Sequence, residues 1–246
     1  MSEGITQNIS TGMVTGVSLG PGDPDLITVK GLKILKQANK IYFPGTLSDD
    51  GKKESYALSI LKNYNLSPKN LHGFYLRMNL DRKQAKERYR QTAQQIKKDY
   101  QIGLKVAVAS EGDAGTYSSF SYLLAHLVND GIPVFTVPGI TSYAAVASSH
   151  SESLCIQNEK MVVLPHINNE EELESCINRF NTVILMKISS AIHIIISILD
   201  KLSPTFFYGE HMGTSRQFTS TALEDIRHRE IPYFALLIIK NKKPAA

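Results

Sequence analysis

Short apolar runs alternate with amphipathic segments along the first 140 residues of the chain. The apolar runs predict strands at residues 14–19, 41–43, 104–110 and 134–137, of which 104–110 is apolar almost throughout, as in a strand buried on both faces. Apolar positions three and four residues apart predict helices at residues 28–38, 56–61, 82–100 and 117–129. This alternation of strands and helices indicates a parallel sheet with crossover helices.

The pattern changes after Gly139, where we place a domain boundary. Residues 141–149 are predicted to form a helix of mainly small side chains, which lets a neighbour or a ligand approach its backbone closely. Further strands are predicted at 161–164, 182–186, 205–208 and 233–239, and helices at 170–179 and 192–202. We therefore predict an α/β protein with a disordered leader at residues 1–12, an N-terminal α/β domain at 13–139 and a C-terminal α/β domain at 140–246.

Two predicted strands end in segments suited to binding a ligand. The first strand runs into a Gly-Pro-Gly turn at residues 20–22, and the strand at 104–110 runs into Glu111-Gly112-Asp113. In an open α/β sheet, ligands bind at the carboxyl ends of the strands. The first turn lacks the G-x-G-x-x-G and G-K-[ST] patterns of dinucleotide and phosphate loops, and its glycines would equally serve a plain strand-to-helix turn. Asp113 would either cap the next helix or accept hydrogen bonds from a ligand, and its place after a buried strand favours the ligand.

Composition narrows the class of protein. The net charge of +4 over 246 residues is too small for a dedicated nucleic-acid binder, and suits an anionic small molecule, RNA or a solvated surface. Two cysteines and seven scattered histidines match no metal motif, and no catalytic serine motif is present. The N-terminus lacks a signal pattern, and the apolar stretch at 191–199 is too short to span a bilayer. We expect a cytoplasmic protein with free thiols, no bound metal, no membrane contact and no nucleic-acid partner.

Four blocks, taken in order, resemble the tetrapyrrole methylase family. They are GVSLGPGDPDLIT at residues 16–28, EGD at 111–113 with YSSF at 117–120, VPGITS at 137–142, and ILMK at 184–187. The resemblance implies a two-domain α/β homodimer that binds S-adenosylmethionine in a cleft between its domains. It also implies methyl transfer to a carbon of an anionic tetrapyrrole, without a nucleophile on the protein.

The site residues follow from matching this sequence to the family motifs. Those implied to bind the cofactor are Pro21, Glu111, Gly112, Asp113, Thr116, Thr141, Ser142, Met186, Gly209, Ala235 and Leu236. Because the substrate carries many carboxylates, arginines should bind it, and we select Arg77, which we place in a loop, and Arg82. No catalytic base is assigned.

Three further segments, at residues 44–45 with 54–57, 76–82 and 117–124, are similar to the family branch that methylates carbon C20 of an early cobalamin precursor, with or without cobalt. The chain departs from the family at Ala114, where a proline is common, and at residues 210–220. Residues 42–45 lack the acidic residue of the uroporphyrinogen methylases. The alternatives are a sister methylase acting on another tetrapyrrole carbon, on RNA or on a modified histidine, and a ligand-binding homologue without turnover.

Overall fold

A computed structural model describes residues 12–48, 50–77 and 82–241 of the chain, so most of the predicted leader lies outside the described residues. Contacts divide the chain into two compact units, Met1–Ile140 and Thr141–Ala246. Within the described part, no helix is both long and apolar enough to cross a bilayer.

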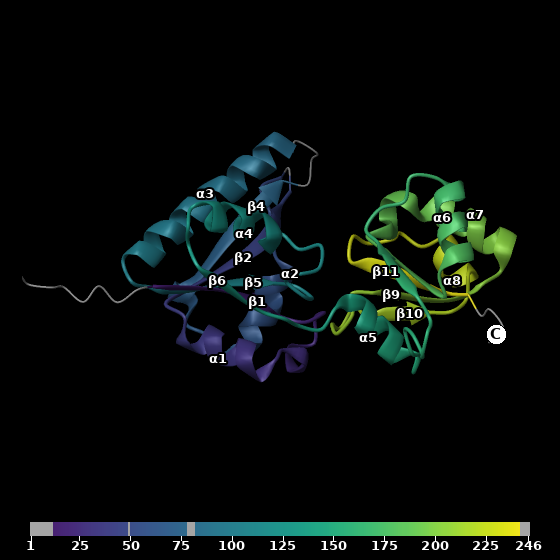
Figure 1. The fold of residues 1–246 in the computed structure, drawn as a ribbon, viewed down its shortest axis with the longest axis horizontal. Helices are drawn as coiled ribbons and strands as arrows, with labels where there is room; N and C mark the ends of the chain where they lie inside the picture. Colours follow the sequence, from purple (N-terminus) through teal and green to yellow (C-terminus); the bar gives the residue numbers. More distant parts are fainter. Residues whose placement is uncertain (1–11, 49, 78–81, 242–246) are drawn as a thin grey trace, which may run out of the picture. The chain divides into compact units, whose positions relative to one another are not determined.

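The first unit is a three-layer α/β structure (Figure 1). Its strands are β1 (Met13–Ser18), β2 (Lys40–Leu47), β3 (Lys53–Glu54), β4 (Leu71–Arg77), β5 (Lys105–Ser110) and β6 (Val134–Val137). They form one sheet in the order β3-β2-β5-β1-β6, with β4 also paired to β2. All pairs are parallel except β2 with β3, which confirms the predicted parallel sheet.

Helices cover both faces of this sheet. Leu35 of α1 (Val29–Gln37) and Ile60 of α2 (Tyr56–Leu61) belong to the core on one face. Ile96 of α3 (Arg82–Gln101) and Leu123 of α4 (Phe120–Asn129) belong to the core on the other. Thr28 begins α1 as its N-cap by accepting a hydrogen bond from the backbone N–H of Gly31 at 3.1 Å. The helices leave the carboxyl ends of β1, β5 and β6 together at one edge of the sheet.

Three local predictions in the first unit are wrong. Strand β2 continues past Pro44 to Leu47 instead of ending at Phe43. It pairs with β5 only as far as Tyr42, so the N–H that Pro44 lacks removes no hydrogen bond to β5. Arg77 lies at the end of β4 rather than in a loop, and Gly73 had obscured the strand pattern of this segment. Helix α4 begins at Phe120 instead of residue 117, since Tyr117 has a left-handed backbone with φ of 50°.

The second unit contains a mainly antiparallel sheet, of which Figure 1 labels β9, β10 and β11. The strand order is β10-β9-β11-β8-β7. The strands are β7 (Met161–Leu164), β8 (Thr182–Met186), β9 (Thr205–Glu210), β10 (Phe218–Ser220) and β11 (Ala235–Lys240). Only β7 and β8 are parallel. Strand β11 begins at Ala235, so Tyr233 and Phe234, predicted within it, lie in the preceding segment.

One face of this second sheet carries three helices, α6 (Glu170–Arg179), α7 (Ile192–Leu202) and α8 (Glu224–Arg227), through a core that includes Leu173, Ile195 and Ile226. Helix α5 (Ser142–Ser149) packs on the other face through Val146 and Ala147. Its small side chains allow a close approach, because a Cβ added at Gly209 of β9 would lie 2.4 Å from Cγ2 of Val146. Gly209 therefore has a packing function in this unit.

Candidate cofactor and substrate site

The carboxyl ends of β1 and β5 are joined directly by backbone hydrogen bonds. The N–H of Gly20 donates to the carbonyl of Gly112 at 3.1 Å, and the N–H of Gly112 donates to the carbonyl of Gly20 at 2.7 Å. The Gly-Pro-Gly turn and the Glu111-Gly112-Asp113 segment thus lie side by side, as the prediction of one binding edge requires.

Asp113 joins this pair of turns to the end of β6. Its Oδ2 accepts a hydrogen bond from the N–H of Gly139 at 2.8 Å. Its Oδ1 accepts from the N–H of Gly115 at 2.9 Å and from the hydroxyl of Thr116 at 3.2 Å. Helix α4 has Ser119 as its N-cap residue, so Asp113 does not cap it. The carboxylate fixes the shape of the two loops by receiving three protein donors.

Ser18 makes a second, buried link between the same loops. Its hydroxyl donates to the carbonyl of Val137 at 2.8 Å and accepts from the N–H of Ala114 at 2.8 Å. A proline at position 114 has no N–H, so the departure of Ala114 from the family pattern supplies the donor that Ser18 uses. A Cβ at Gly139 would lie 2.4 Å from Cβ of Ser18, and this contact requires glycine there.

Helix α2 supports the other side of the edge. The hydroxyl of Tyr56 donates to the carbonyl of Pro21 at 3.1 Å, and the N–H of Ala57 donates to Oε1 of Glu111 at 3.2 Å. Tyr64, just after α2, donates to the carbonyl of Pro24 at 2.9 Å, and burial raises its pKa to about 12. Pro21 and Glu111 are therefore held in position by α2 and the residues that follow it.

In the second unit, adjacent strands bring together four of the residues selected from the sequence. Leu236 of β11 lies opposite Met186 of β8 on one side and Gly209 of β9 on the other, with Ala235 beside it. Thr141 accepts a hydrogen bond from the N–H of Ala144 at 3.4 Å and caps α5, whose first residue is Ser142. Both residues thus begin the helix that packs on this sheet.

Several residues that the sequence reasoning did not select lie at the same edge of the second sheet. Lys187 and His211 follow β8 and β9 with left-handed φ angles of 55° and 48°. Their N–H groups donate to the carbonyls of Ala235 and Phe234 at 3.1 and 3.0 Å. Nζ of Lys187 lies 5.5 Å from the centroid of the Tyr233 ring, and Tyr233 and Phe234 are 47% and 42% exposed. Positive φ at residues other than glycine often marks functional sites, but it has no sequence signature here.

The two arginines selected for the substrate are described to different extents. Arg77 is an exposed residue at the carboxyl end of β4. Arg82 is the first residue of α3, and its side chain lies outside the described part of the structure.

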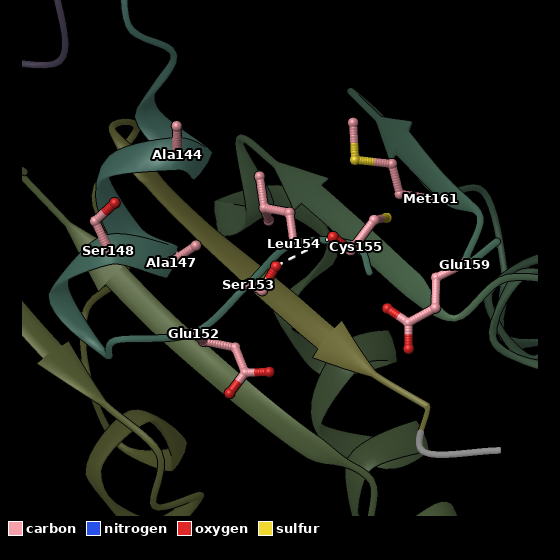
Figure 2. Close-up of a pocket in the computed structure, with 9 residues that line it drawn as sticks. All are labelled: Ala144, Ala147, Ser148, Glu152, Ser153, Leu154, Cys155, Glu159 and Met161. Atoms are coloured by element: carbon pink, nitrogen blue, oxygen red, sulfur yellow. Dashed lines mark hydrogen bonds between the residues drawn. The ribbon is translucent and has the colours of Figure 1, made fainter. Parts of the chain in front are cut away.

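A cavity of about 610 Å³ opens elsewhere in the second unit, between α5 and the segment that leads to β7 (Figure 2). It is lined by Ala144, Ala147, Ser148, Glu152, Ser153, Leu154, Cys155, Glu159 and Met161. None of the residues selected from the sequence is among them. Glu159 pairs with Lys240 at 3.3 Å, and Ser153 donates to the carbonyl of Cys155 at 3.1 Å, so these polar groups stabilise the wall itself.

Comparison with known proteins identifies the class. Residues 13–226 match the model of the family Tetrapyrrole (Corrin/Porphyrin) Methylases, so the chain belongs to this family. The chain also resembles a solved cobalt precorrin-4 methyltransferase, with a TM-score of 0.69, 20% identity and coverage of 96% of this chain and 98% of the other. A uroporphyrin-III C-methyltransferase from Thermus thermophilus complexed with S-adenosyl homocysteine gives a TM-score of 0.64 at 19% identity, over 93% of this chain and 97% of the other.

Two curated relatives narrow the comparison to one reaction within the family. The chain is 35% identical to a probable cobalt-precorrin-2 C(20)-methyltransferase of Methanocaldococcus jannaschii, over 71% of each protein. It is 26% identical to the cobalt-precorrin-2 C(20)-methyltransferase of Salmonella typhimurium, over 94% of this chain and 97% of the relative. These relatives support the resemblance to the C20-methylating branch.

Proposed function

We propose that this chain transfers the methyl group of S-adenosylmethionine to carbon C20 of precorrin-2, or of its cobalt-containing form, in cobalamin biosynthesis. The observation that carries the proposal is the likeness, across both units, to relatives named for that reaction. The linked strand ends of the first unit support it, because they form the kind of edge at which α/β proteins bind small molecules.

The residues proposed to bind the cofactor fall into two groups. Those of the first unit are Pro21, Glu111, Gly112, Asp113 and Thr116, and those of the second are Thr141, Ser142, Met186, Gly209, Ala235 and Leu236. Glu111 and Asp113 already accept hydrogen bonds from the protein. We therefore assign to their carboxylates the task of shaping the loops, while backbone groups of residues such as Gly112 and Ala235 contact the cofactor.

Methyl transfer depends more on alignment of the reacting atoms than on general acid or base catalysis. A π electron pair at C20 forms the bond to methyl as the bond between methyl and sulfur breaks, and the electron pair of the broken bond stays on sulfur to give S-adenosylhomocysteine. The methylated carbon then loses its proton to water. Holding the carbon, methyl and sulfur in line contributes on the order of 7–11 kcal/mol. A rigid set of loops, such as the one that Ser18 and Asp113 build, suits this task.

The substrate is a flat macrocycle with several carboxylates. Arg77 and Arg82 remain proposed partners for these carboxylates, since arginine binds them in bidentate fashion. We add Lys187, whose ammonium lies beside the half-exposed ring of Tyr233. A cation beside an exposed aromatic ring is suited to an anionic, flat ligand.

Two further properties belong to the proposal. We expect a homodimer, which sedimentation analysis would measure, and a cytoplasmic location, which cell fractionation would test.

Methyl transfer is tested with radiolabelled S-adenosylmethionine and either precorrin-2 or its cobalt-containing form. We expect label in the tetrapyrrole, release of S-adenosylhomocysteine and a change in visible absorbance. Label in RNA, with binding that weakens steeply as salt rises, would instead favour the RNA-methylating alternative. Cofactor binding without transfer to either tetrapyrrole would indicate a homologue that has lost turnover.

A further inference from the structure

An ion pair with a buried carboxylate lies immediately beside the strand residues that the proposed function assigns to the cofactor. Glu210, the last residue of β9, is only 4% exposed. Arg229 donates to its two carboxylate oxygens, from Nε at 2.9 Å and from Nη2 at 2.6 Å. The hydroxyl of Tyr208 donates to the same carboxylate. A carboxylate this buried is costly unless it is paired and hydrogen-bonded, and here it is both.

The pKa shifts of Glu210 and Tyr208 agree with this geometry. Burial alone would raise the pKa of Glu210, but hydrogen bonds from Arg229 and Tyr208 outweigh burial and lower it. Burial and the bond to Glu210 raise the pKa of Tyr208, so its hydroxyl stays protonated and donates. The carboxylate is therefore charged and held from two directions.

Arg229 ties a separate segment to this carboxylate. It belongs to the stretch between α8 and β11, which leads directly into Tyr233, Phe234 and Ala235. Its guanidinium carbon lies 3.9 Å from the centroid of the Phe218 ring on β10. The Arg229 guanidinium thus fixes the segment before β11 against β9 and β10. Because this planar group donates two parallel hydrogen bonds to one carboxylate, it restricts the movement of that segment.

The backbone that this pair fixes is the backbone proposed to bind the cofactor. Glu210 lies opposite Ala235, and Gly209 lies opposite Leu236, in the register of β9 and β11. The next residue, His211, donates its N–H to the carbonyl of Phe234 at 3.0 Å. A shift of the segment before β11 would therefore move the Gly209, Ala235 and Leu236 backbone groups together.

We infer that Arg229 is a positioning residue for the cofactor, acting through the carboxylate of Glu210 on the ends of β9 and β11. This inference rests on the proposed function. It predicts that loss of the bidentate pair weakens cofactor binding in protein that is still folded, because the backbone contacts lose their alignment. Arg229 is not proposed to contact the cofactor itself, since its guanidinium contacts Glu210 and Phe218 rather than the residues assigned to the cofactor.

The test compares two arginines that lie two residues apart. R229M removes the pair with Glu210, whereas the control R227M removes the same charge from ion pairs with Asp200 and Glu224, whose carboxylates are more exposed than that of Glu210. The dissociation constant of S-adenosylhomocysteine is measured by calorimetric titration well below each variant's unfolding temperature. We expect it to rise at least tenfold in R229M and to change less than twofold in R227M.

R229M leaves a buried carboxylate without its cation, so it can fail to fold. The double variant E210Q/R229M removes both charges and keeps a polar group for Tyr208, and it should fold and bind at least tenfold more weakly. R229K, which keeps the charge but not the fork, should lie between R229M and the parent protein. A folded double variant with unchanged affinity would overturn the inference. A parent protein that binds no S-adenosylhomocysteine would overturn the proposed function itself.

Discussion

Replacing Asp113 by alanine tests whether its carboxylate holds together the strand ends that we propose bind the cofactor. The change removes acceptors from the N–H groups of Gly139 and Gly115 and from the hydroxyl of Thr116. The bonds to Gly139 and Thr116 are partly buried, and the bond to Gly115 is exposed. A hydrogen bond to a charged group is worth about 1.5–3 kcal/mol, and we assign most of the loss to the backbone N–H of Gly139, which cannot rotate to another acceptor as the Thr116 hydroxyl can. The total loss should therefore be about 2–3 kcal/mol.

Differential scanning calorimetry would show this loss as a melting temperature about 4–12 °C lower, given roughly 2–4 °C for each kcal/mol in a chain of this size. Calorimetric titration should show S-adenosylhomocysteine binding at least tenfold more weakly, about 1.4 kcal/mol. D113N should be as damaging as D113A. Both carboxylate oxygens receive donors, so an amide nitrogen in either place would meet another donor.

The matched control is D130A in the same unit. Asp130 makes an exposed ion pair with Lys97 at 3.0 Å, and such pairs contribute about 0–1 kcal/mol. D130A should leave the affinity for S-adenosylhomocysteine unchanged. If D113A were as stable as D130A and bound the cofactor product equally well, the role given to Asp113 would be refuted.

Three other predictions follow from the same contacts. S18A loses both buried hydrogen bonds of the Ser18 hydroxyl and should lower the free energy of unfolding by about 2 kcal/mol in denaturant titrations. Adding A114P to S18A should cost little more, because the hydroxyl that accepts from the Ala114 N–H is already gone. If S18A and A114P each lowered the free energy of unfolding and their losses added in the double variant, the shared bond would be contradicted. Because the pKa of Glu210 is lowered in the folded state, its contribution to stability is present above the ordinary carboxyl pKa of about 4.3 and is lost as pH falls through the folded value. E210Q should therefore flatten the dependence of stability on pH in the acid range, and an unchanged slope would count against the pair. K187M should raise the KM for the tetrapyrrole at least threefold while leaving the affinity for S-adenosylhomocysteine as it was, and the reverse pattern would remove Lys187 from the substrate site.

The strand ends of the first unit were predictable from the sequence because apolar runs stopped at Gly-Pro-Gly and at Glu111-Gly112-Asp113. Parallel pairing then placed both ends at one edge. The function of Asp113 within that edge was not predictable. Its partners Gly139 and Thr116 are recognised only when the loops after β5 and β6 are folded together.

Other features escaped prediction for local physical reasons. The apolar pattern of strand β4 is interrupted at Gly73, so Arg77 looked like a loop residue. The left-handed conformations of Tyr117, Lys187 and His211 are set by tertiary contacts rather than by residue type. The pair of Glu210 and Arg229 joins residues 19 apart, from a strand end and a loop, with no spacing that marks them in the sequence.

The central claim is methyl transfer to one particular carbon. The most direct measurement supplies S-adenosylmethionine labelled with ¹³C in its methyl group, together with precorrin-2 or its cobalt-containing form, and locates the new methyl by heteronuclear NMR correlation. The account predicts a single labelled methyl bonded to C20. A methyl on any other ring carbon, or folded protein that binds the cofactor and transfers no label to either tetrapyrrole, would contradict it.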